Sequence, residues 1–88
     1  MPCMARVFLT FEAARQLEAL KVPIVNRVQG LLEKLEQWPT ISGAKPLRGA
    51  LKGNWRLRTG DWRIVFRVEG DAVRVWAIDN RRDVYGDL

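Results

Sequence analysis

The sequence predicts an α+β domain in which a two-helix hairpin packs on one face of a mainly antiparallel four-stranded sheet, in the order β-α-α-β-β-β. An apolar stripe with helical spacing in the first half indicates the helices. Three runs of alternating residues, separated by two Gly-Asp turns, indicate the antiparallel strands of the second half. With 88 residues the chain is expected to form one domain, residues 1–88, because this length has room for one helical layer against one sheet.

The first half begins with a short strand, predicted near residues 5–10. Val7 and Leu9 share one face of this strand because side chains alternate along an extended chain. Thr10 is the expected N-cap of a helix near residues 11–20, since a threonine hydroxyl accepts a hydrogen bond from an amide of the first turn.

A second helix is predicted near residues 23–37. Pro23 opens it at the first helical position, where a missing amide hydrogen costs nothing, and Pro39 ends it. Five apolar residues fall at spacings of 4, 3, 4 and 3 along this stretch: Ile24, Val28, Leu31, Leu35 and Trp38. Because the connection between the two helices is short, they are expected to form an antiparallel hairpin.

The second half begins with a predicted loop, residues 39–53, in which proline and glycine recur. Three strands are predicted after it, near residues 54–59, 62–69 and 72–79. The pairs Gly60 and Asp61, then Gly70 and Asp71, fit the two-residue connections of β-hairpins.

Alternation gives the predicted sheet two different faces. The apolar face is expected to be covered by the helices and consists of Trp55, Leu57, Trp62, Ile64, Phe66 and Val68. The opposite face is expected to be open and basic, with all of its arginines outside the core: Arg56, Arg58, Arg63 and Arg67. If the strands pair about the first turn, Arg63 is expected beside Arg56.

The alternation leaves the position of Trp76 open. This residue is out of phase with its apolar neighbours Val73, Val75 and Ala77. It would therefore lie on the open face of the sheet or have a structural role.

Positive charge is concentrated in one part of the chain, whose formal net charge is +5. Residues 45–63 contain one acid, Asp61, and six cations: Lys45, Arg48, Lys52, Arg56, Arg58 and Arg63. Clustered arginines suit bidentate contacts with phosphate, so the cluster predicts a nucleic-acid partner. The alternative is a solvated basic surface with no partner.

Composition excludes several kinds of site. The chain has no histidine and one cysteine, so metal sites built on imidazole, an internal disulfide and histidine acid–base catalysis are all excluded. We expect no cofactor and no metal. The sequence contains no secretion signal and no apolar run of membrane-spanning length, which predicts a cytoplasmic protein without a membrane partner.

Four segments carry a resemblance to a known family. They are KPLRG at residues 45–49, WRLR at 55–58, GDWRIVF at 60–66 and RRDVY at 81–85. They resemble the "K-L-x-G", "Y-R-[LI]-R", "G-x-[YW]-R-[IVL]-[VI]-[YF]" and "H-R-x-x-[VI]-Y" motifs of the RelE/ParE toxins. The specific motifs cover roughly residues 45–85, while length and element order agree along the whole chain.

The resemblance implies the RelE-like microbial RNase fold and the toxin of a type II toxin–antitoxin pair. Such a toxin would cut messenger RNA in the ribosomal A site by metal-independent attack of the 2′-hydroxyl, and so inhibit translation. Its implied partners are a cognate antitoxin, the ribosome and messenger RNA. The implied catalytic residues are Arg63, Arg81, Tyr85, Arg56 and Lys52. The basic residues expected to bind RNA are Lys45, Arg48, Arg58, Arg67 and Arg82.

Chemistry suggests a role for each catalytic candidate. Arg63 and Arg56 would stabilise negative charge on the phosphate oxygens. Lys52 or Tyr85 would accept the 2′-proton, and Arg81 would stabilise the leaving oxygen. The alternatives are structural: Tyr85 would pack against the sheet, and Arg81 would pair with a nearby aspartate.

One position departs from the family pattern. Asn80 stands where many members have a histidine, and an amide cannot exchange a proton. The sequence therefore matches best those members that cleave with lysine, arginine and tyrosine. A ParE-like toxin that inhibits DNA gyrase without cutting RNA, or a degenerate protein that only binds its antitoxin, are the alternatives.

Overall fold

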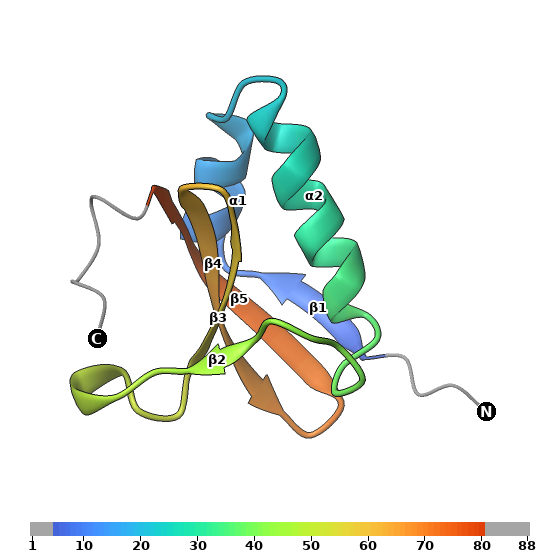
Figure 1. Cartoon of the computed structure of the whole chain (residues 1–88), viewed down its shortest axis with the longest axis vertical. Coiled ribbons are helices and arrows are strands. Elements are labelled where there is room, and N and C mark those ends of the chain that lie inside the picture. The colour runs from blue at the N-terminus through green and yellow to red at the C-terminus, as the bar shows by residue number, and fades with distance from the viewer. Residues whose placement is uncertain (1–4, 81–88) are drawn as a thin grey trace.

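A computed structural model describes residues 5–80 of the chain and shows an α+β fold (Figure 1). The elements, in chain order, are β1 (Arg6–Leu9), α1 (Phe11–Glu18), α2 (Ile24–Leu35), β2 (Lys45–Pro46), the 3₁₀ helix η1 (Gly49–Leu51), β3 (Trp55–Thr59), β4 (Trp62–Glu69) and β5 (Ala72–Asn80). The described strands form one sheet in the order β1-β5-β4-β3-β2. None of the helices between residues 5 and 80 is both long enough and apolar enough to cross a membrane.

The two helices lie close to their predicted positions and run in opposite directions (Figure 1). Thr10 is the N-cap of α1, as predicted, and its hydroxyl accepts a hydrogen bond from the Ala13 amide at 3.2 Å. Pro23 caps α2 and is not its first helical residue. Both helices are shorter than predicted because their last residues form turns, although the apolar stripe continues beyond α2 to Trp38.

The sheet has one more strand than the sequence predicted. β2, inside the predicted loop, pairs antiparallel with β3 through Lys45 opposite Arg56 and Pro46 opposite Trp55. Two residues are too few to show alternation, so no sequence pattern marks this strand. β1 lies parallel to β5 at the other edge, and the remaining pairs are antiparallel.

The apolar face of the sheet packs under the helices, as predicted. Leu57, Ile64 and Phe66 are at most 2% exposed and join Val28 and Leu35 of α2 in the main core. Trp38 contacts this face edge-on, with its ring centroid 5.0 Å from that of Trp55 and 5.4 Å from that of Phe66. The helices therefore do not cover the opposite face of the sheet, here called the outer face.

The outer face is not wholly open, contrary to the sequence prediction. Leu47, Val65 and Ala77 are buried there, and Leu51 and Trp76 pack against them. We call these five residues the outer cluster. It forms because the segment between β2 and β3, predicted to be a polar loop, contributes two leucines that cover the middle of the sheet.

A β-bulge interrupts the alternation of β5 at Trp76, which lies on the outer face. Phe66 pairs with Val75 while Val65 pairs with Ala77, so Trp76 is the extra residue of β5. The bulge shifts the alternation: Val75 faces the main core, whereas Ala77 joins the outer cluster. The prediction that Ala77 shares a face with Val75 is therefore wrong.

Candidate nucleic-acid interface

Cations on neighbouring strands line up across the outer face. In one row Arg58 of β3 lies opposite Arg63 of β4, which in turn lies opposite Asp79 of β5. Directly opposite residues of an antiparallel pair project to the same side, with Cβ atoms about 4.5–5.5 Å apart. Like charges so placed repel each other, so the adjacent arginines favour an anionic ligand.

The register corrects the sequence prediction of which arginines are neighbours. Arg63 lies directly opposite Arg58, whereas Arg56 lies opposite Val65. The two-residue turn pairs Thr59 with Trp62 and so determines every later pair. Arg56 is then a diagonal neighbour of Arg63, about 7–8 Å away, which is still within reach of long side chains.

Arg63 is buried, although the sequence placed it on an open face. Its exposed fraction is 2%, whereas Arg56 is half-buried and Arg58 is exposed. β4 is an inner strand, so Arg63 has neighbours on both sides, and Val65 of the outer cluster follows two residues later on the same face. Burying a guanidinium is costly unless other groups compensate its charge, and Asp79 is the carboxylate in its row.

A basic loop, residues 45–53, borders this row of arginines. Lys45 pairs with Arg56 across the β2–β3 ladder. Arg48 and Lys52 flank the short helix η1, and all three cations of the loop are exposed. The loop therefore adds positive charge beside the arginines of β3.

Arg67 does not join this group. It lies four residues beyond Arg63 on β4, roughly 13 Å along the strand, and the outer cluster lies between them. Its cross-strand neighbour is Arg74, whose guanidinium pairs with Glu69 at 3.5 Å. Three further predicted site residues, Arg81, Arg82 and Tyr85, lie outside the described residues.

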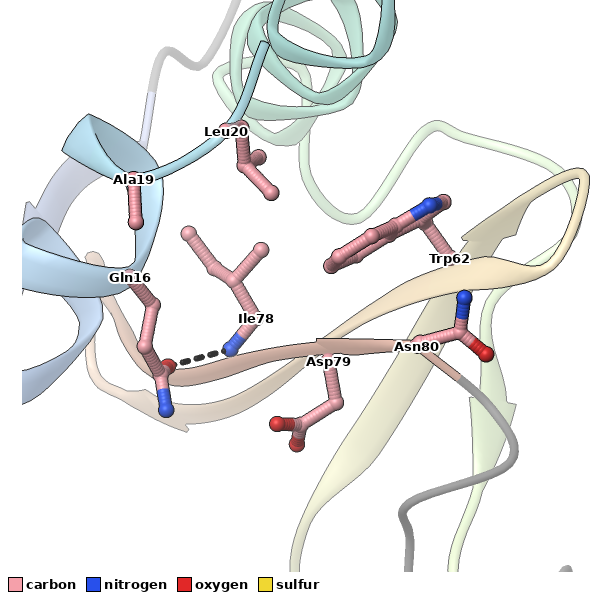
Figure 2. A pocket seen from close by; sticks show the side chains of 7 residues that line it. All are labelled: Gln16, Ala19, Leu20, Trp62, Ile78, Asp79 and Asn80. Carbon is pink, nitrogen blue, oxygen red and sulfur yellow. Dashed lines mark hydrogen bonds between the residues drawn. The ribbon is translucent and has the colours of Figure 1, made fainter.

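A shallow pocket of about 270 Å³ opens at the end of β5, beside α1. It is lined by Gln16, Ala19, Leu20, Trp62, Ile78, Asp79 and Asn80 (Figure 2). The Gln16 side-chain oxygen accepts a hydrogen bond from the Ile78 amide at 2.8 Å. This amide lies beyond Val75, where the pairing of β5 with β1 ends, so Gln16 takes the place of a strand partner there. The Asp79 carboxylate points away from α1, toward the side of the sheet that carries Arg63 (Figure 2).

The pocket is separate from the row of arginines on the outer face. Asn80 pairs with Trp62, which packs against the main core, so Asn80 belongs to the helix side of the sheet. The residue at the position of the family histidine is therefore on the other face from Arg63. Between residues 5 and 80, no cluster of three or more acidic or cysteine side chains could hold a metal ion.

Sequence reasoning missed the position of Asp79 opposite Arg63 and the hydrogen bond of 2.8 Å from the Trp76 indole to the Asn54 side chain. Counting back from the second turn without a bulge would place Ile78 opposite Arg63, and the bulge moves Asp79 there. The out-of-phase position of Trp76 indicated its place on the outer face but not the bulge, which moves Ala77 to the same face. Asn54, just before β3, carried no such signal.

Comparisons with known proteins give a consistent picture. The family model described as the ParE toxin of the type II toxin–antitoxin system parDE matches residues 7–85. The toxin–antitoxin complex RelBE2 from Mycobacterium tuberculosis matches with a TM-score of 0.79 and 28% identity, covering 94% of this chain and 98% of that one. No curated protein sequence matches the chain significantly.

Two further structures have the same fold at lower identity. The isolated RelE toxin of Escherichia coli has a TM-score of 0.72 and 18% identity over 86% of this chain and 83% of its own. The YoeB–YefM complex from Staphylococcus aureus has a TM-score of 0.69 and 15% identity over 84% of this chain and 93% of that one.

Proposed function

Since this chain belongs to the ParE toxin family within the RelE/ParE superfamily, we propose that it is an endoribonuclease that cuts messenger RNA on the ribosome and so inhibits translation. The toxin domain would comprise residues 1–88 and act in the cytoplasm. The observation that carries the proposal is the row in which Arg58 lies opposite Arg63, with Arg56 diagonal to it. Such juxtaposed guanidinium groups suit the charge on a phosphodiester.

The proposed reaction is attack of a ribose 2′-hydroxyl on the adjacent phosphorus. The P–O5′ bond breaks, which leaves a 2′,3′-cyclic phosphate and a 5′-hydroxyl. Arg56 and Arg58, which are accessible at the surface, would bind the phosphate. The buried Arg63 would stabilise negative charge on the equatorial oxygens of the phosphate. Because Arg63 is covered in the free protein, RNA binding must uncover its guanidinium.

Two proton transfers complete the reaction. The 2′-proton would pass to Lys52 or Tyr85, and the leaving 5′-oxygen would take up a proton from water at the end of the step. Arg81 would stabilise that oxygen, because arginine remains charged and is a poor proton donor. Lys45, Arg48, Arg67 and Arg82 would hold the flanking RNA. Lys52 is exposed in the basic loop, where RNA can reach it.

A cognate antitoxin is the proposed protein partner. The M. tuberculosis neighbour is a toxin–antitoxin complex. An acidic or amphipathic segment would complement the outer face of this chain electrostatically.

Induced expression of this chain alone is expected to arrest growth, and co-expression of the small protein encoded beside it is expected to restore growth and give a stable complex. The measurement is colony formation, followed by co-purification. A Val22→Ala toxin, altered at an exposed position in the turn between the helices, is the control and should behave like wild type. Growth unaffected by the toxin alone, or failure of the neighbouring protein to bind, would contradict the proposal.

A second candidate is inhibition of DNA gyrase without RNA cleavage. The match to the ParE model favours it, as does the burial of Arg63, which keeps one proposed catalytic group from solvent. The two functions differ in their cellular effects. A ribonuclease breaks messenger RNA, whereas a gyrase poison induces the SOS response.

A further inference from the structure

The basic loop is tied to the sheet by a hydrogen bond from Trp76. The indole Nε1 donates to the Asn54 side-chain oxygen at 2.8 Å. Trp76 lies on β5 and Asn54 precedes β3, with β4 between these strands in the sheet. The bond therefore crosses β4 on the outer face, where the Trp76 ring lies because Trp76 alternates with the core residue Val75.

Asn54 makes three further hydrogen bonds, all with the basic loop. Its side-chain nitrogen donates to the Leu51 carbonyl at 3.1 Å, and its amide donates to the same carbonyl at 3.0 Å. Its own carbonyl accepts from the Leu47 amide at 2.9 Å. Asn54 is 8% exposed, so loss of any of these partners would leave a buried polar group unsatisfied.

Apolar contacts act at the same point. Leu47 and Leu51 come from the two ends of the turn that carries Arg48, and both belong to the outer cluster. The loop otherwise projects beyond the sheet (Figure 1). A projecting loop is mobile unless such contacts hold it, and long cationic side chains on a mobile loop lose entropy when they bind.

We propose that Trp76 and Asn54 are positioning residues that hold the basic loop in the conformation that contacts single-stranded RNA beside Arg56 and Arg58. This inference rests on the proposed ribonuclease function. The pair preorganises Arg48 and Lys52, so that RNA binding does not have to order them.

Hydrogen exchange tests, without RNA, whether the Trp76–Asn54 hydrogen bond holds the basic loop. In Trp76→Phe, which keeps a ring but removes the donor, the amides of Leu47, Lys52 and Asn54 are expected to exchange at least about tenfold faster. Amides of β4 should keep their wild-type rates. Trp62→Phe, which removes an indole from the helix side, is the matched control and should leave the loop protected. Unchanged protection of the loop in Trp76→Phe would overturn the proposal.

The RNA readout uses a single-stranded oligonucleotide with 2′-O-methyl riboses, which binds but cannot be cleaved by 2′ attack. Each phosphate contact contributes about 0.7 to the salt slope of binding to a single strand. Loss of ordered contacts from Arg48 and Lys52 should therefore lower the slope by up to about 1.4 in Trp76→Phe, with Trp62→Phe unchanged. An unchanged salt slope in Trp76→Phe would indicate a purely structural role and would overturn the proposal.

A double-mutant cycle completes the experiment. Asn54→Ala removes the bond to Trp76 and also the side-chain bond to the Leu51 carbonyl, so the combined variant should bind RNA no worse than Asn54→Ala alone. Additive losses of RNA-binding affinity would contradict the proposal that Trp76 and Asn54 act through one hydrogen bond. If the wild-type protein binds no RNA, the proposed function fails, while the exchange rates still show whether Trp76 holds the loop.

Discussion

Replacement of Arg63 by alanine is expected to abolish growth arrest and to slow RNA cleavage at least about a hundredfold. Loss of one preorganised donor typically costs about 2.7 kcal/mol or more of transition-state stabilisation. Arg63 combines two features that favour such an effect: it lies opposite Arg58, and its burial places it where water screens charge weakly. Cleavage of a translated reporter message, measured at equal amounts of folded protein, gives the size of the effect.

Because Arg63 is buried, its removal also leaves a cavity and takes the neighbouring cation from Asp79. Urea unfolding must therefore accompany the kinetics. Arg63→Lys is the matched variant, since it keeps the charge and most of the volume but not the bidentate fork, and it should also lose most activity. Arg81→Ala is expected to be equally inactive. Folded Arg63→Ala protein that cleaves at the wild-type rate would show that the assigned site is wrong.

Removal of both surface arginines, Arg56→Ala with Arg58→Ala, is expected to weaken binding of single-stranded RNA most strongly at low salt. Two phosphate contacts contribute about 1.4 to the slope of affinity against salt concentration, so the slope should fall by about that amount. Arg56 and Arg58 are on β3 and outside the main core, so the fold should persist. The measurement is fluorescence anisotropy of a labelled oligonucleotide across a salt series.

Arg74→Ala is the control for this pair. Arg74 is exposed like Arg58 but pairs with Glu69, and it lies on the far side of the outer cluster from the arginine row. Its replacement should leave the salt slope unchanged. Equal losses from Arg74→Ala and from the double variant would show that the outer face attracts RNA only through overall charge.

Local patterns in the sequence were sufficient for most of the fold. The Thr10 cap, the helical stripe and the alternation through Ile64 and Phe66 each reflect contacts within a few residues, and each was confirmed. The two hairpin turns were also predictable, because glycine readily adopts the positive φ found at Gly60 and Gly70, 61° and 62°.

The arrangement of the site depends on non-local packing and could not be predicted in full. A single extra residue at Trp76 decides which side chain lies opposite Arg63. The burial of Arg63 likewise depends on neighbouring strands and on the outer cluster, which includes Leu47 from a segment that looked like a solvent-exposed loop. Alternation assigned the correct face to Arg63 but not its exposure.

Primer extension on a translated reporter message, after induced expression of this chain, tests the ribonuclease function most directly. The proposal predicts new 5′ ends within the coding region that appear within minutes, disappear when the start codon is removed, and are absent with Arg63→Ala. The SOS response should remain at its basal level. An intact message together with growth arrest and a strong SOS response would contradict RNA cleavage and favour inhibition of gyrase.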